Sequence, residues 1–287
     1  NIFYIKDLQT AFDVIYCFLS MKTTIDRETA NYYFNLIQIA LPPSIETISA
    51  GSFSGFENLI SIVIPSSVTS IEKRAFDACK SLKSIKLPNS ITSIEYITFY
   101  SCEALKHITI PSSVTTISGS AFQLCSSLEE VVISPSITMI ASSVFESCEK
   151  LRRIVIPPSV TTIKDDAFFE CTSLVEVYFP NTLNYIGFNA FRNCSSIAVL
   201  VIPKSVSVIE KYAFYGCSSL KQVIFENNSS LTVLNDQVFS KCSSLSQISF
   251  PSSLNSIKRY VFSECKSLRE LNIPSSVGFI GKNTFFG

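Results

Sequence analysis

Hydrophobic positions recur along this chain with a spacing of 23 residues. Cysteine lies three residues after most of the phenylalanines that mark this repeat, from Cys79 to Cys265, and leucine lies six residues after most of them, as at Leu82. The phenylalanines follow one another at 23 residues, with one interval of 25: Phe53, Phe76, Phe99, Phe122, Phe145, Phe168, Phe191, Phe214, Phe239, Phe262 and Phe285. This periodicity is typical of solenoids, whose repeats bury their apolar sides only against their neighbours. We therefore expect one stack of coils.

Shorter patterns inside each repeat predict its local structure. Ile85 and Leu87 alternate with polar residues, which predicts a short strand with these two side chains pointing inward. Pro88 follows, and we expect the strand to end there because proline has no backbone N–H for a sheet ladder. Ile91 and Ile94 lie in a Ser/Thr-rich segment that predicts a second, returning strand.

The segment around each repeat phenylalanine carries a different spacing. Ala75, Phe76, Cys79 and Leu82 are separated by one, three and three residues, which predicts a single helical turn. Stacked strands lie ~4.8 Å apart, so about eleven coils form a rod on the order of 50 Å long. Each column of the repeat then becomes a ladder of like residues along the rod.

The run SLKSIKLPNSITSIEYITFYSC and its copies resemble the BspA-type leucine-rich repeat, with its pattern x-L-x-x-I-x-I-P-x-S-V-x-x-I-x-x-x-A-F-x-x-C-x-S. The resemblance covers roughly residues 31–287. It implies a leucine-rich-repeat solenoid with short parallel β-strands on the concave face and return strands and helical turns on the convex side. It also implies a surface or secreted protein of a bacterium or parasitic protist that adheres to a protein partner, such as a host or matrix protein. The family brings no catalytic residues.

The two ends of the chain depart from the repeat. Residues 1–29 do not fit it, and we expect them to form an N-terminal capping segment before a solenoid over 30–287. The apolar stretch Ala11–Met21 is too short to cross a membrane and lacks the features of a signal peptide. The chain stops at Gly287 without a visible cap, so we expect a solenoid truncated at its C-terminus.

Composition excludes several classes of protein. The chain has 23 Lys and Arg against 23 Asp and Glu, without a basic block, which excludes the electrostatic footprint of a nucleic-acid binder. Hydrophobic residues make up 47% and charged residues 16%, which excludes intrinsic disorder. No apolar run approaches the ~18–20 residues of a membrane-spanning helix. We therefore predict no nucleic-acid partner and no membrane span in this chain.

The ten cysteines allow three interpretations: disulfides, metal ligands or buried thiols. Nine of them form one column of the repeat, which cannot pair completely, and the chain contains no Cys-x-x-Cys to hold zinc. Their place beside Phe and Leu in each coil favours buried free thiols, and we predict no metal site. Disulfides between some neighbouring coils stay open, because Cα atoms ~5 Å apart are within reach of one. Cys17 lies outside the column and is the one candidate reactive thiol.

Signals for catalysis are weak. His107 is the only histidine, and its neighbour in the next coil is Glu130, so a cross-coil pair is an open interpretation beside a solvated surface side chain. Ser-x-x-Lys occurs at Ser70–Lys73 and Ser147–Lys150, without the structural context which that motif needs in serine hydrolases. No glycine-rich phosphate loop is present. We predict a protein that is not an enzyme and carries no cofactor.

The outward positions of the predicted strands carry the candidate binding residues. Ten residues after the repeat phenylalanine, five successive coils have an apolar side chain, with polar residues before and after them: Val132, Val155, Tyr178, Val201 and Ile224. We call this row the apolar stripe. An exposed apolar row with a polar rim is typical of an interaction site. The adjacent outward column places alternating charges beside it: Glu130, Arg153 and Glu176.

Two hypotheses for function remain at this point. The first is a recognition or adhesion solenoid that binds a protein through its concave face, at the cell surface or after secretion. The second is a stalk or an intracellular scaffold without a specific binding face, because Val, Ile and Tyr are favoured in strands whichever way they point.

Overall fold

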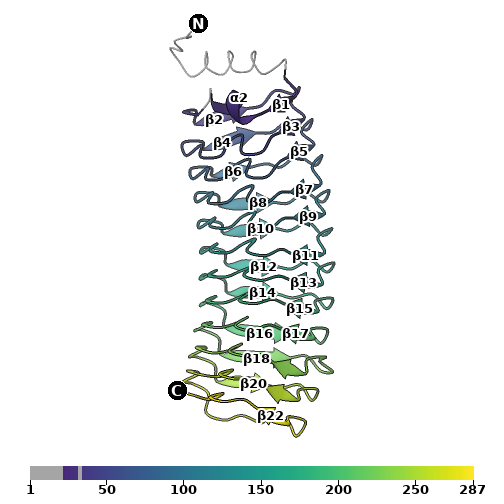
Figure 1. Ribbon diagram of the computed structural model, residues 1–287, viewed down its shortest axis with the longest axis vertical. Helices are drawn as coiled ribbons and strands as arrows, with labels where there is room; N and C mark the ends of the chain where they lie inside the picture. The colour runs from purple at the N-terminus through teal and green to yellow at the C-terminus, as the bar shows by residue number, and fades with distance from the viewer. Residues whose placement is uncertain (1–21, 32–33) are drawn as a thin grey trace.

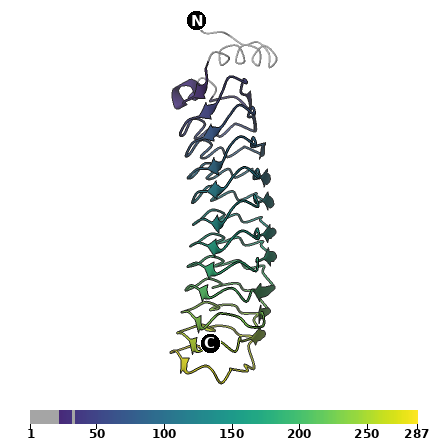
Figure 2. The same cartoon turned by 90° about the vertical axis from the view of Figure 1, so that its right-hand side faces the viewer.

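The computed structural model describes residues 22–31 and 34–287, which form a parallel β-solenoid of about eleven turns of ~23 residues. The coils stack into a long, nearly straight rod with one row of strands along each of two sides (Figure 1). Turned by 90°, the same rod is narrow, and both rows of strands run along its length (Figure 2). The parallel solenoid predicted from the 23-residue spacing is confirmed.

The longer strands form the front sheet, at the position predicted for the concave face. Alternation places every second side chain inside the coil, and a proline follows most of the strands within three residues, as Pro88 follows Ile85. The strands of the front sheet are β2 (Gln38–Ala40), β4 (Ser61–Val63), β6 (Ser84–Ile85), β8 (His107–Thr109), β10 (Glu130–Val132), β12 (Arg153–Val155), β14 (Glu176–Tyr178), β16 (Val199–Ile202), β18 (Gln222–Phe225) and β20 (Gln247–Ser249).

The predicted return strands are also present, two residues long each, and together they form the return sheet. Most of them, like most of the front strands, pair in parallel with the same column of the next coil, as where Thr162 pairs with Tyr185. They are β1 (Thr24–Ile25), β3 (Thr47–Ile48), β5 (Ser70–Ile71), β7 (Ser93–Ile94), β9 (Thr116–Ile117), β11 (Met139–Ile140), β13 (Thr162–Ile163), β15 (Tyr185–Ile186), β17 (Val208–Ile209), β19 (Val233–Leu234), β21 (Ser256–Ile257) and β22 (Phe279–Ile280).

The segment predicted as a helical turn forms consecutive tight turns instead. Cys79 N donates to Phe76 O at 3.2 Å within the coil, whereas Phe76 N donates to Thr98 O of the next coil at 2.9 Å. A helix directs every backbone N–H along its own axis, so it cannot make these bonds between coils. Left-handed residues on either side of the phenylalanine, Arg74 at φ 59° and Ala78 at φ 56°, turn alternate N–H groups toward the neighbour.

One of these left-handed positions holds a strained residue. Ile97 has φ 60°, which a β-branched side chain adopts only at a cost, whereas asparagine tolerates this conformation. We expect Ile97→Asn to raise the free energy of unfolding by about 1 kcal/mol in urea titrations followed by circular dichroism. Ile97→Val is the matched control, because it keeps the branched Cβ and removes no strain. Equal stability of the asparagine variant and the original chain would contradict the assignment of strain.

Ladders of identical residues fill the core. Phenylalanine rings of successive coils stack almost parallel, with centroids 5.5 Å apart for Phe76 and Phe99. The nine cysteines of the repeat are buried and free, as the sequence favoured. Each thiol also donates to the carbonyl of a phenylalanine in the preceding coil, as from Cys125 Sγ to Phe99 O at 3.1 Å. Burial raises the pKa of these thiols, to about 12 for Cys125 and Cys217.

The N-terminal end of the described rod carries a short helix, α2 (Arg27–Asn31), the one helix within residues 22–31 and 34–287. β1 precedes it and pairs with β3, so stacking in the return sheet begins at Thr24. Cys17 and most of the predicted capping segment, including Ala11–Met21, lie outside the described residues. Over the part of the chain that is described, no helix combines the length and apolar character needed to cross a membrane.

Candidate binding surface

The apolar stripe lies on the outer side of the front sheet, where strand alternation places it. Val132, Val155, Tyr178 and Val201 project from four successive front strands, and each is between 47% and 52% exposed. Ile224 is half-buried on β18, where it pairs with Val201. Four members of the predicted stripe are therefore open to solvent in consecutive coils, and the fifth is only partly accessible.

The predicted charge column runs beside the stripe, and each of its three charged groups lies near a partner in a neighbouring coil. His107 Nδ1 lies 3.9 Å from Glu130 Oε2, and Arg153 Nε lies 3.6 Å from Glu176 Oε2. The Arg153 guanidinium also lies over the ring of Tyr178, 5.1 Å from its centroid, and the Tyr178 hydroxyl donates to Glu176 Oε2 at 3.0 Å. These contacts link the charge column to the stripe. Exposed pairs contribute little stability, so the charges are available to orient a partner.

The front sheet is interrupted at two places along the stripe. Hydrogen bonds connect β2 through β10, then β12 with β14, then β16 through β20, and the sheet is open between β10 and β12 and between β14 and β16. Val132 and Val155 stand on the two sides of the first opening, and Tyr178 and Val201 on the two sides of the second. The four exposed stripe residues therefore border the two openings in pairs.

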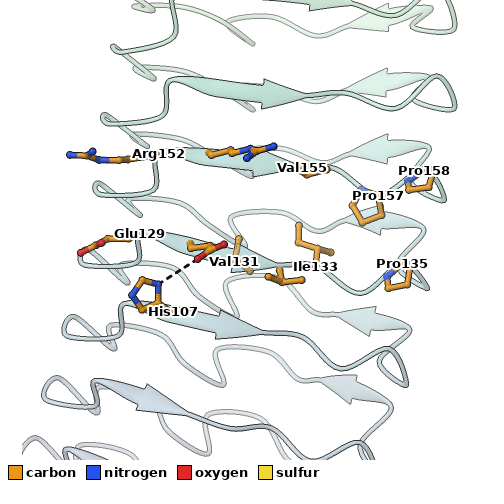
Figure 3. Close-up of a pocket in the computed structure, with 12 residues that line it drawn as sticks. His107, Glu129, Val131, Ile133, Pro135, Arg152, Val155, Pro157 and Pro158 are labelled. Carbon is orange, nitrogen blue, oxygen red and sulfur yellow. Dashed lines mark ion pairs between the residues drawn. The ribbon is translucent and has the colours of Figure 1, made fainter.

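A groove of about 620 Å³ occupies the first opening, between β10 and β12. Val131 and Ile133, whose side chains belong to the core, also line it, so a ligand in the groove would reach core side chains between the coils. Figure 3 shows Glu129 and Arg152 at one end of this groove and Pro157 at the other. The groove thus combines an apolar lining with charges of both signs at one end.

A second groove of about 520 Å³ lies in the opening between β14 and β16. Besides Tyr178 and Val201, it is lined by Val175 and Val199, which are 49% and 47% exposed. The stripe column did not include these two valines. One signal marks Val175: the same column holds Lys83, Lys106, Glu129 and Arg152 in the four coils before it, so the column changes from charged to apolar at this coil.

Over residues 22–31 and 34–287, no group of three or more His, Cys, Asp or Glu side chains is placed to hold a metal ion. The front sheet offers shape, apolar area and charge to a partner.

The repeat itself matches a known family. A model of the BspA type leucine rich repeat region matches residues 23–152, 138–231 and 161–287, with six copies. The chain belongs to the BspA-type leucine-rich-repeat family. No curated protein sequence matches this BspA-type chain at a significant level.

Solved structures of bacterial leucine-rich-repeat proteins are similar to this BspA-type chain. A leucine-rich repeat protein from Bacteroides ovatus is 28% identical over 88% of this chain and 84% of its own, with a TM-score of 0.59. A leucine rich cell surface protein from Faecalibacterium prausnitzii is 28% identical over 89% of this chain and 78% of its own, with a TM-score of 0.57. The pneumococcal vaccine antigen PcpA, 22% identical over 86% of this chain and 69% of its own with a TM-score of 0.59, shares the fold.

Proposed function

We propose that this chain is a non-enzymatic recognition or adhesion solenoid that binds a protein partner through the apolar stripe of its front sheet. The observation that carries the proposal is the row Val132, Val155, Tyr178 and Val201, half-exposed in four successive coils beside a column of charges. Contiguous exposed apolar area with a polar rim is typical of protein interaction sites. Tyr178 is the central anchor, because tyrosine is enriched among the residues that dominate binding energy.

We further propose that the protein acts at the cell surface or after secretion, on a host or matrix protein. Support comes from the family and from the name of the similar Faecalibacterium prausnitzii structure, a leucine rich cell surface protein. A rod of stacked coils presents a long face to a large ligand, which suits adhesion to another protein.

Charged substitutions in the stripe test the binding face. We expect Tyr178→Asp and Val201→Asp each to weaken binding to a purified partner at least tenfold, because a buried, unpaired carboxylate opposes desolvation of the interface. Affinity is measured by surface plasmon resonance, with the partner first identified by pull-down with the original chain. Circular dichroism checks that each variant is folded.

Val63→Asp is the matched control. Val63 is 64% exposed at the same column on β4, in a coil outside the stripe, so its substitution changes the charge of the front sheet without touching the proposed face. Unchanged affinity in folded Tyr178→Asp and Val201→Asp variants would contradict the proposal that the stripe is the binding face. The chain would then be better described as a stalk or scaffold that separates other modules.

A further inference from the structure

The grooves of the front sheet recur every second coil. One lies between β6 and β8, the next between β10 and β12, and the third between β14 and β16. The first mixes polar side chains such as Lys86, Asn89 and Thr109 with apolar ones such as Ile85 and Ile108, whereas both others are bordered by stripe residues. The two apolar grooves are therefore two coils apart along a straight rod.

This spacing restricts the secondary structure of a partner segment laid along the rod. Ring centroids of neighbouring coils lie 5.7, 5.5 and 5.0 Å apart from Phe122 to Phe191, so the two apolar grooves, two coils apart, are separated by about 11 Å. An α-helix rises 1.5 Å per residue, so side chains at i and i+7 lie on one face about 10.5 Å apart. In an extended strand, residues on one face are about 7 Å or about 13 Å apart, and neither value fits.

The charge column matches the same spacing. Glu130 and Glu176 stand two coils apart, with Arg153 between them. On a helix, residues at j, j+3 or j+4, and j+7 form one row with nearly the same steps. A helix with the order Lys, Glu, Lys in that row complements the column while its apolar face meets the stripe.

We infer that the partner segment bound by the front sheet is an amphipathic α-helix that lies along the rod and places apolar side chains at i and i+7 into the two grooves. This inference rests on the proposed function, because it names the kind of partner that the same face takes. The helix buries its apolar face over Val155 and Tyr178, which lie between the two grooves, while its outer face stays in water.

Two stapled helical peptides of identical composition test the geometry, each 18 residues long and fluorescently labelled. One carries its two leucines at i and i+7, with the Lys, Glu, Lys row beside them, and the other carries its leucines at i and i+5, on different faces. Fluorescence anisotropy against the full chain is expected to show at least tenfold tighter binding of the i, i+7 peptide. Val155→Asp and Val201→Asp should each weaken that binding about tenfold, whereas Val63→Asp should leave it unchanged.

The outcomes separate this inference from the proposed function. Three results would overturn the inference of a helical partner: equal affinity of the two peptides, no binding of either, or a loss of affinity in Val63→Asp equal to that in the stripe variants. If binding of the purified protein partner nevertheless falls in the Tyr178→Asp and Val201→Asp variants, the front sheet binds proteins in another conformation. If neither the partner nor the i, i+7 peptide responds to the stripe substitutions, both proposals fail.

Discussion

Phe145→Ala is expected to lower the free energy of unfolding by about 3–5 kcal/mol. Phe145 is fully buried near the middle of the rod, and its ring stacks between Phe122 at 5.7 Å and Phe168 at 5.5 Å, measured between centroids. Alanine removes both ring contacts and leaves a cavity that the rigid neighbouring coils cannot close. The loss is a large part of the ~5–15 kcal/mol that stabilises a typical domain.

The solenoid architecture predicts where this loss is felt. Each coil contacts only its neighbours. The free energy of unfolding is therefore approximately the sum of the intrinsic stability of each coil and the stabilisation from each interface between neighbouring coils. Phe145→Ala weakens the two interfaces of one coil and should divide a single cooperative transition into two. Urea unfolding followed by circular dichroism measures the transitions, and hydrogen exchange read by mass spectrometry shows which coils open first.

Phe285→Ala provides the control at the end of the described rod. Phe285 belongs to the same column, is 48% exposed and stacks on one ring, that of Phe262, with a centroid separation of 5.9 Å. Its replacement should lower the free energy of unfolding by about 1 kcal/mol or less. If Phe145→Ala were no more destabilising than Phe285→Ala, the phenylalanine stack would not be the main axis of the core.

The sequence alone predicts the coil, its register and its core, because one residue type in one column must occupy the same place in every coil. The alternation before Pro88 identifies a front strand, and Ile94 identifies a return strand, as the structure confirms. Exposure of Val132, Val155, Tyr178 and Val201 follows from the same alternation. A period of 23 residues thus carries information about side-chain direction as well as fold.

Two features leave no such mark in the sequence. Strands β8 and β10 pair, and their inward-facing residues are Ile108 and Val131. Strands β10 and β12 do not pair, although their inward-facing residues, Val131 and Ile154, are of the same two types. The openings therefore depend on how whole coils pack and not on one column. The spacing of Ala75, Phe76 and Cys79 suits a helical turn, yet hydrogen bonds between coils select tight turns with left-handed residues at this place.

The cysteine column predicts a steep loss of stability at alkaline pH. Burial raises the pKa of the Cys125 and Cys217 thiols from 9.0 to about 12, and it raises the pKa of the other seven thiols of the column as well. In the unfolded chain the thiols ionise near pH 9, whereas in the folded chain Cys125 and Cys217 keep their protons until about pH 12 and the other buried thiols keep theirs above pH 9. The unfolded state therefore binds fewer protons in this window, and the free energy of unfolding falls as the pH rises.

The number of thiols makes the effect large. The stability that the raised pKa of each thiol contributes is present below pH 9 and is lost as the pH rises above 9. For a thiol such as Cys125 this loss is about 1 kcal/mol by pH 10. Nine of them together remove on the order of 10 kcal/mol, which is comparable to the stability of a whole domain. We expect the urea midpoint to change little from pH 7 to 8.5 and to fall steeply above pH 9, with a reductant present to prevent oxidation of unfolded thiolates.

Cys125→Ser separates the thiols from the tyrosines and lysines that also titrate at high pH. A serine hydroxyl can still donate to Phe99 O, as the Cys125 thiol does at 3.1 Å, but it does not ionise in this range. The variant should release one proton fewer on unfolding above pH 9, and Cys125→Ser combined with Cys148→Ser should release two fewer. An unchanged pH slope in the double variant would show that the ladder thiols do not govern alkaline unfolding, whatever the variants lose in stability at neutral pH.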